Sequence, residues 1–358
     1  MSIRMAALFL WLMLFTVLVV SQAVADTSPQ DGCRQLRVGV ILPLSGPSAA
    51  VGAAFRNGIE LGLSDHSAQG ALALSFEDDG LEPRRSLAAL AKLRIEGVDL
   101  VVSISSSTSN ALAPVLERHG IPCIAVASDA QILRAHREAY LFWNHPEDEA
   151  RVMFQELFKR GMRKVIRIAT TDAWSLSIQE ALRSLEAKGA QKVIVEEHEV
   201  APDIRDFSTV ISKMTMQRNA HATGVQMILL TPQLGLFARQ LRAQGIHLPL
   251  FGFSSFADST AQEDARGALT GSWYVNHVEP AQEFPARYRN RYPGASLYSA
   301  AHGYEIARLL TRIAPPRCGK GRFADQLEQA LRSPGLFGLL RLDQKRRVRF
   351  PLEVYSIP

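Results

Sequence analysis

Short apolar runs alternate with amphipathic segments along most of this chain. Residues 36–42 (LRVGVIL) form a nearly continuous apolar run, which predicts a buried strand. The next segment spaces Phe55 and Ile59 four residues apart, as on one face of a helix. The same alternation continues to residue 127. Strands that alternate with helices predict a parallel sheet covered by helices on both faces.

The pattern starts again after Asn144-His145-Pro146 and continues to residue 253. Two α/β sets in succession predict two lobes. The remaining elements are expected to be a strand at 268–275, helices near 280–291, 297–313 and 322–332, and an antiparallel pair of strands near 337–342 and 348–356.

The segment 101–115 (VVSISSSTSNALAPV) leads an apolar strand into a helical pattern through a group of hydroxyl and amide side chains. We expect Ser109 or Asn110 to cap the helix. The first backbone N–H groups of a helix lack intrahelical partners and carry the positive end of its dipole, so this corner suits a carboxylate or another small polar ligand. A well-capped helix with solvated serines is the alternative.

Asp172 and Trp174 share a second strand-to-helix corner. They predict either a ligand contact or a helix cap beside a packing tryptophan. Ligands of open α/β sheets bind outside the carboxyl ends of the strands. The corners expected to face a ligand are 44–49, 103–108, 127–130, 170–175, 231–233 and 253–255.

At 358 residues the chain is long enough for two domains and a sizeable core. Its formal net charge of +5 is small for this length and does not favour nucleic acid as a partner. The densest basic run, at 345–349, lies between two apolar stretches and is interpreted as a solvated turn.

The first 25 residues have the features of a secretory signal peptide. Arg4 precedes the uncharged stretch 5–20, and Ala23 and Ala25 supply the small residues of a cleavage site after residue 25. The sequence therefore predicts a soluble exported protein.

Three cysteines are present. Cys123 lies in an apolar strand and is expected to be a buried thiol. Cys33 and Cys318 lie in polar, glycine-containing segments, so an oxidising compartment predicts a disulfide between them.

No nucleophile elbow, phosphate-binding loop, dinucleotide fingerprint or HExxH motif occurs in the sequence. The cysteines and histidines show no zinc-ligand spacing. We therefore expect a binding protein without catalytic residues, cofactor or metal, and a hydrolase is a minor alternative.

Four segments carry a family resemblance: 38–47 (VGVILPLSGP), 76–80 (FEDDG), 105–108 (SSST) and 299–305 (SAAHGYE). In their order and spacing, from about residue 36 to 357, the chain resembles the periplasmic ligand-binding proteins of branched-chain amino acid ABC transporters, the Leu/Ile/Val-binding type.

The resemblance implies the type I periplasmic binding protein fold, with two Rossmann-like lobes joined by three hinge crossings that close on a ligand. It assigns residues 36–144 plus 255–335 to lobe 1 and residues 145–254 plus 336–358 to lobe 2.

The resemblance also implies ligand contacts. The serine corner, with Ser105, Ser106 and Thr108, would bind a carboxylate. Ser128 and Asp129 would add contacts from the first lobe. From the second lobe, Trp174 would cover the ligand.

Three positions depart from the family pattern. Relatives have aromatic residues near the positions of Val51 and Thr231, and an acid for the ligand's ammonium near Ser254. Thr231 and Ser254 are still expected to contact the ligand. Asp129 or Asp172 would then have to supply the negative charge, since an unpaired buried ammonium is costly.

The resulting hypothesis is a monomeric periplasmic binding protein that delivers a small polar ligand, most simply a branched-chain or aliphatic amino acid, to an ABC permease. One alternative ligand is an amide, a urea-like compound or a small carboxylic acid. Another alternative is a sensory or regulatory subunit that uses the same two-lobed clamp.

Overall fold

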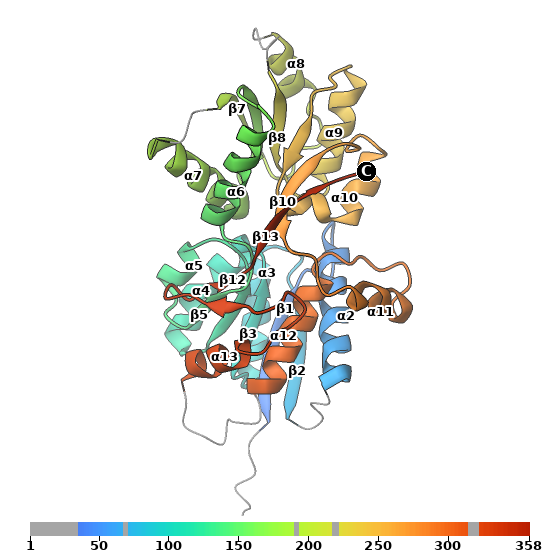
Figure 1. Ribbon diagram of the computed structural model, residues 1–358. Coiled ribbons are helices and arrows are strands. Elements are labelled where there is room, and N and C mark those ends of the chain that lie inside the picture. Colours follow the sequence, from blue (N-terminus) through green and yellow to red (C-terminus); the bar gives the residue numbers. More distant parts are fainter. Residues whose placement is uncertain (1–34, 67–70, 190–192, 217–221, 314–321) are drawn as a thin grey trace, which may run out of the picture.

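The computed structural model describes residues 35–66, 71–189, 193–216, 222–313 and 322–358. The predicted signal peptide and the predicted Cys33–Cys318 disulfide lie outside these ranges. Within them the chain forms two α/β lobes stacked one on the other (Figure 1).

The sheet of the first lobe is parallel, and β1 (Leu36–Leu42) lies between two neighbours in it. Every residue of β1 except Arg37 is buried, because helices cover both faces of the sheet. The strand order changes direction at β1, which creates a switch point at the carboxyl ends of β1 and β3. From edge to edge the strands are β2 (Leu72–Asp78), β1, β3 (Leu100–Ile104), β4 (Cys123–Val126) and β5 (Ala139–Leu141).

Two groups of helices enclose this sheet. Buried residues such as Leu90, Leu112 and Ile132 pack three helices on one face, and Phe55, Leu310 and Leu327 pack three on the other. The first group is α3 (Pro83–Glu96), α4 (Ser106–His119) and α5 (Gln131–Ala135); the second is α2 (Ala49–His66), α12 (Ala300–Ile313) and α13 (Phe323–Leu331), with α11 (Glu283–Arg291) beside it.

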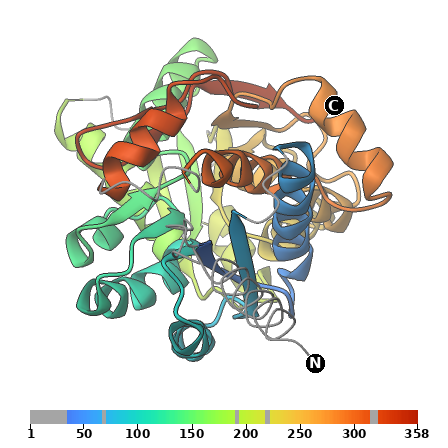
Figure 2. The same ribbon diagram turned by 90° about the horizontal axis from the view of Figure 1, so that it is seen from below.

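Helices α2 and α12 lie side by side although they are far apart in sequence (Figure 2). Glycines permit this approach. A Cβ on Gly58 would lie 2.0 Å from the carbonyl oxygen of Ala300, and one on Gly303 would lie 2.1 Å from that of Phe55. The segment 299–305 therefore packs α12 against α2 in the first lobe.

The sheet of the second lobe is larger and mixed. Its order changes direction at β6, so a second switch point lies at the carboxyl ends of β6 and β8. From edge to edge the strands are β13 (Leu352–Ser356), β10 (Trp273–His277), β9 (Leu250–Gly252), β8 (Gly224–Ile228), β6 (Val165–Thr170) and β7 (Ile194–Val200), and β13 is antiparallel to β10.

Helices also cover both faces of the second sheet. Ile178 and Phe251 belong to the buried cluster on one face, and Phe207 and Phe237 to the cluster on the other. The helices are α6 (Pro146–Lys159) and α7 (Ala173–Ala187) on the first face, and α8 (Ser208–Met216), α9 (Gln233–Ala243) and α10 (Ser259–Ala265) on the second, with a 3₁₀ turn, η1 (Ser254–Ala257), before α10.

The chain passes between the lobes three times: after β5, after β10 and before β13. The predicted boundaries at 255 and 335 were wrong. Strand β10 belongs to the second sheet, so the chain returns to the first lobe only after residue 277. Phe337 and Phe350 pack in the first lobe's core, so the last crossing follows residue 350, after the small hairpin of β11 (Arg341–Leu342) and β12 (Val348–Arg349).

Polar side chains from the crossings are buried together. Asn144 donates hydrogen bonds to Asn276 (3.0 Å) and to Glu149 (3.1 Å), and the ring of His145 bonds to the carbonyl of Val348 (2.9 Å). Glu149 is fully buried, and desolvation raises its pKa to about 8. The carboxyl is therefore protonated at neutral pH. The hydrogen bonds of Asn144 and His145 connect the three crossings to one another.

The basic run at 345–349 includes a turn between two strands, as the sequence predicted, but its arginines are paired rather than solvated. Arg347 pairs with Glu147 (3.2 Å) and Arg349 with Asp148 (2.8 Å), which links the β11–β12 hairpin to the first turn of α6. The Arg346 guanidinium donates to the backbone carbonyls of Leu133, His136, Arg137 and Ala139.

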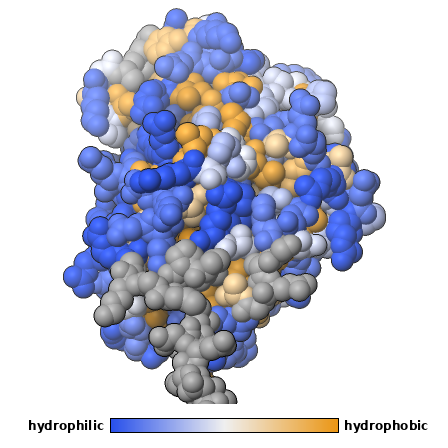
Figure 3. All heavy atoms as spheres, turned by 60° about the horizontal axis from the view of Figure 1, so that its bottom comes forward, coloured by the Kyte–Doolittle hydropathy of each residue, from blue (hydrophilic) through white to orange (hydrophobic). Residues whose placement is uncertain are grey.

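Hydrophilic residues predominate on the face seen in Figure 3, with apolar residues in scattered patches. Ile95 and Val195 are among the exposed large apolar residues. Within the described residues, no helix combines the length and the apolar character needed to cross a membrane.

Candidate functional site

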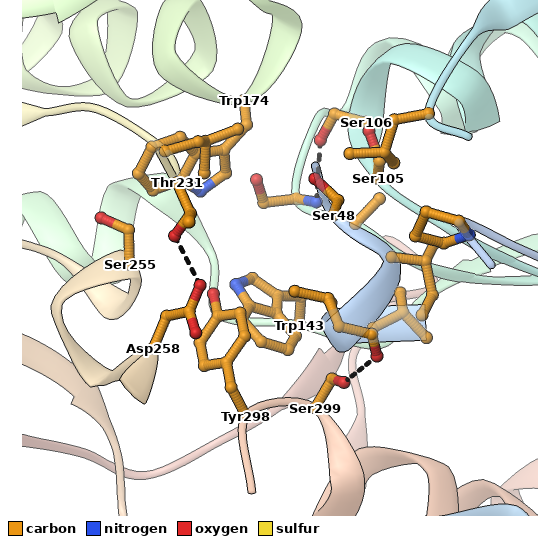
Figure 4. Close-up of a pocket in the computed structure, with 18 residues that line it drawn as sticks. Ser48, Ser105, Ser106, Trp143, Trp174, Thr231, Ser255, Asp258, Tyr298 and Ser299 are labelled. Atoms are coloured by element: carbon orange, nitrogen blue, oxygen red, sulfur yellow. Dashed lines mark hydrogen bonds between the residues drawn. The ribbon is translucent and has the colours of Figure 1, made fainter. Parts of the chain in front are cut away.

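A cleft lies between the lobes at both switch points (Figure 4). It holds about 810 Å³ of empty space, part of it open to solvent. The residues that line it are Pro43, Ser48, Val51, Leu81, Ile104, Ser105, Ser106, Val126, Ala127, Ser128, Trp143, Trp174, Leu230, Thr231, Ser255, Asp258, Tyr298 and Ser299.

The serine corner begins α4 earlier than predicted. Ser105, rather than Ser109 or Asn110, is the N-cap, and its hydroxyl accepts from the backbone N–H of Ser107 at 3.3 Å. Its φ of 82° places the backbone in a conformation that non-glycine residues rarely adopt. The turn is held at the positive end of the α4 dipole, beside the cleft.

Several hydroxyl groups at the cleft are available to a ligand. Ser106 Oγ accepts from the backbone N–H of Ser128 and of Asp129, each at 3.3 Å, and keeps its own hydrogen to donate. Ser128 Oγ and Ser255 Oγ are buried and, within the described part of the chain, have no hydrogen-bond partner. Unsatisfied buried hydroxyls at a cleft indicate contacts that a ligand would complete.

Asp258 carries the only charged side chain among the described residues that line the cleft. The short η1 turn after β9 places it there, and only 3% of it is exposed. Thr231 donates to its carboxylate at 2.5 Å, and the backbone N–H of Thr260 donates at 3.0 Å. Desolvation raises the pKa of Asp258, so a cationic group beside it would be stabilising.

Aromatic side chains form much of the wall. Trp143 follows β5, Trp174 begins α7 in the other lobe, and Tyr298 precedes α12. The Trp143 ring lies 6.0 Å from Tyr298 and 4.3 Å from His302 between centroids. An apolar wall with a few polar groups suits a small ligand that has an apolar part.

Five of the nine predicted ligand residues line the cleft. Ser105 and Ser106 lie on the first-lobe side, and Trp174 and Thr231 on the second-lobe side (Figure 4). Ser128 follows β4 and also belongs to the first lobe. The structure therefore brings together the serine corner and the aromatic residue that the resemblance paired.

The two predicted carboxylates do not line it. Asp129 accepts from the side-chain amide of Asn110 at 2.7 Å, and its other oxygen accepts from the backbone N–H of Gln131 at 2.9 Å. Asp172 is the N-cap of α7 and accepts from the backbone N–H of Ser175 at 3.1 Å. Both carboxylates are used in local structure, which was the alternative that the sequence left open for Asp172.

Thr108 and Ser254 are also absent from the lining. The hydroxyl of Thr108 donates to the carbonyl of Ile104, one turn back, at 2.6 Å. Ser254 is buried. Burial raises the pKa of Tyr298, and a hydrogen bond with the Ser254 side chain partly opposes this rise.

Asp258, Trp143 and Tyr298 are among the cleft residues that the sequence did not predict. Asp258 precedes Ser259 and Thr260, so its pattern indicates a helix cap, and it is indeed the N-cap of α10. Trp143 stands at a strand end and could have been noticed there. Tyr298 lies in a loop with no periodic signal.

The periplasmic binding protein family model matches residues 35–340, most of the chain, and the protein belongs to this family. The family consists of solute-binding proteins of transporters rather than enzymes. Within the described residues, no cluster of His, Cys, Asp and Glu could hold a metal ion.

Two named relatives are Leu/Ile/Val-binding protein homolog 3 of Brucella melitensis and Leu/Ile/Val-binding protein BraC3 of Rhizobium johnstonii. The first is 26% identical and the alignment covers 61% of this chain and 60% of the relative. The second is 23% identical, with 74% and 72% covered. The chain thus matches somewhat less than two thirds of the first relative's length.

Solved structures share the fold. A leucine-binding protein of Thermotoga maritima has a TM-score of 0.80 at 18% identity, covering 90% of this chain and 95% of that one. A Rhodopseudomonas palustris solute-binding protein in complex with benzoate has a TM-score of 0.79 at 18% identity, covering 91% and 94%. These likenesses support the type I periplasmic binding protein fold with two lobes.

Proposed function

We propose that this protein is the periplasmic solute-binding component of an ABC importer and binds an aliphatic amino acid in the interlobe cleft. Family membership supports the transport role, and the Leu/Ile/Val-binding relatives support the ligand class. The permease is the expected partner, and a monomer is the expected state of the binding protein.

The observation that carries the ligand proposal is Asp258. A buried carboxylate next to an apolar wall pairs with an ammonium group, while the serine corner donates to a carboxylate from the other side of the cleft (Figure 4). A zwitterion with an apolar side chain satisfies all of these groups.

A ligand that carries only a carboxylate fits less well. Its charge would have no basic partner among the described lining residues and would lie near Asp258. A neutral amide or urea-like compound would leave the Asp258 carboxylate without a counter-charge. The benzoate-bound neighbour shares the fold at 18% identity and does not outweigh this argument.

Isothermal titration with L-leucine, L-valine, leucinamide and isovalerate tests the proposal. We expect wild-type protein to bind leucine, and Asp258→Asn to weaken that binding about tenfold or more, because a charge-assisted contact is lost. Asp129→Asn is the matched control and should keep leucine affinity within about threefold. Preferential binding of isovalerate or leucinamide, or unchanged leucine affinity in Asp258→Asn, would refute the assignment.

A further inference from the structure

A hollow on the second lobe is lined by arginines. It holds about 810 Å³ of empty space, part of it open to solvent. Helix α9 and the segment after α10 form its walls, and these two helices pack side by side (Figure 1). The polar side chains that line it are Arg239, Arg242, His247, Arg266 and Thr270.

This hollow lies at the opposite edge of the second sheet from the interlobe cleft. The cleft meets the carboxyl end of β8 at Leu230 and Thr231. Strands β8, β9 and β10 are parallel, and His247 precedes β9 while Thr270 precedes β10, so these two residues lie at the amino ends of the strands. Helix α9 begins beside the cleft, and its 11 residues span about 16 Å. A ligand in the hollow would therefore be separate from a ligand in the cleft.

The packing of α9 on α10 brings three guanidinium groups to this hollow. Arg239 and Arg242 are three residues apart on α9 and share one face of the helix. Gly235 lies one turn before Arg239 on that face, and a Cβ there would lie 2.9 Å from the backbone nitrogen of Ala265. This close approach places Arg239 at the end of α10, where Arg266 follows.

One of the three arginines is held in place by the backbone. Nη1 of Arg242 donates to the carbonyls of Ile246 at 2.8 Å and Leu248 at 2.9 Å, on either side of His247. Its other N–H groups donate to no group in the described part of the chain. Burial lowers the pKa of Arg242, so an anion beside the guanidinium would be stabilising.

The positive charge of the hollow has no carboxylate partner among the described residues. The acids of α10, Glu263 and Asp264, do not line it, and within the described ranges neither forms an ion pair with an arginine. Pro358 is nearby, because Gly271 donates to the carbonyl of Ile357 at 2.8 Å, but it also lies outside the lining. The dipoles of α9 and α10 offset at most about one of the three charges. An anion would relieve the remaining repulsion.

These donors suit a multivalent oxyanion. A guanidinium presents its N–H groups as a fork that matches the oxygens of a phosphate or a carboxylate. A planar carboxylate has two oxygens, whereas a tetrahedral phosphate presents oxygens to several sides at once and carries more charge. The hydroxyl of Thr270 and a ring N–H of His247 add two further donors.

We propose that this hollow is a second binding site, for a small phosphate-type anion, at the end of the second lobe that is remote from the cleft. The same side chains would bind free phosphate or the phosphate of an anionic lipid headgroup, and the test separates these two sources.

Inorganic phosphate is the first probe, and titration calorimetry at neutral pH is the measurement. We expect phosphate to bind wild-type protein with a Kd of about 1 mM or below, and sulfate, which has the same shape and charge, to compete with it. Chloride at the same ionic strength should not compete, because it cannot accept from several guanidinium groups in fixed directions. The matched ionic strength keeps general screening equal.

Arginine variants locate the site. Arg239→Gln and Arg266→Gln each remove one guanidinium and leave the backbone bonds of Arg242 intact, so each should weaken phosphate binding about fivefold or more. Arg118→Gln is the matched control, since it removes an exposed arginine from the last turn of α4 in the other lobe. It should change phosphate affinity by less than about twofold. Leucine affinity should be the same in all three variants.

Vesicles identify the source of the phosphate. Sedimentation of the protein with vesicles of phosphatidylglycerol and phosphatidylcholine, but not with phosphatidylcholine alone, supports a lipid headgroup if Arg266→Gln reduces it. Binding of inorganic phosphate without sedimentation supports a free anion.

Three results would overturn the proposal: no saturable phosphate binding up to about 10 mM; equal loss of phosphate affinity in Arg118→Gln and Arg266→Gln; or competition by chloride as strong as that by sulfate. Failure of leucine and other amino acids to bind would refute the proposed function instead, and the phosphate measurements would still decide this site.

Discussion

Replacing the buried hinge carboxyl, Glu149→Gln, should make the protein more stable than wild type, by an amount that increases as the pH rises. Glu149 is fully buried in the first turn of α6, and its Oε1 accepts from Asn144. Desolvation is the main cause that raises its pKa from 4.5 to about 8, and Asp148 adds to it. Glutamine keeps the shape and the acceptor but cannot ionise.

The sign follows from proton binding. Between pH 4.5 and about 8 the folded protein holds a proton on Glu149 that the unfolded chain has released. The stability associated with this group is therefore complete below pH 4.5 and is lost as pH rises through about 8. At about 1.4 kcal/mol per pKa unit, the loss from 4.5 to about 8 amounts to roughly 5 kcal/mol, an upper estimate.

The histidines act in the opposite direction. Burial lowers the pKa values of His145 and His277 to about 4, so their contribution is lost as pH falls below 6.5 towards 4. They are the same in both proteins and cancel in the comparison.

Urea unfolding of wild type and Glu149→Gln at about pH 5, 7 and 8.5 measures the effect. The stability of the variant relative to wild type should increase at each step, by several kcal/mol in total. Glu147→Gln, an exposed neighbour paired with Arg347, should give a small offset that does not change with pH. A difference for Glu149→Gln that is constant within about 0.5 kcal/mol would refute the reasoning.

Two further substitutions test the packing and the serine corner. Gly303→Ala should lower the free energy of unfolding by about 3 kcal/mol, because its Cβ would lie 2.1 Å from the carbonyl oxygen of Phe55. The control Ala53→Gly, on the exposed side of α2, should lower it by about 1 kcal/mol. Equal urea midpoints for the two variants would contradict this expectation. Ser105→Gly should keep stability within about 1 kcal/mol, since glycine suits a φ of 82°, yet reduce leucine affinity about tenfold in calorimetry; unchanged affinity would remove this hydroxyl from the site.

The sequence predicted the alternation of strands and helices because buried parallel strands are nearly all apolar, and this pattern is local. It also identified the serine corner, because hydroxyl side chains between an apolar strand and a helical pattern are typical of a helix N-terminus. Strand β5 and helix α5 were missed, since three and five residues are too short to show a period.

Asp258 could not have been predicted as a cleft residue from its neighbours. Its local pattern indicates a cap, and it is one; only the position of η1 between β9 and α10 turns it towards the other lobe. The crossing after β10 was missed for a similar reason. Nothing near residue 277 indicates a change of lobe, because membership of a sheet depends on which distant strand supplies the hydrogen bonds.

The order of strands in the second sheet has a consequence for how the chain acquires its structure. Strand β13 forms the edge of that sheet by pairing with β10, about 80 residues earlier. During synthesis the first sheet can form from an early contiguous segment, whereas the second keeps an open edge on β10 until residues 352–356 emerge. Loss of residues 352–358 would expose that edge, and an unpaired strand is a template for pairing with another chain.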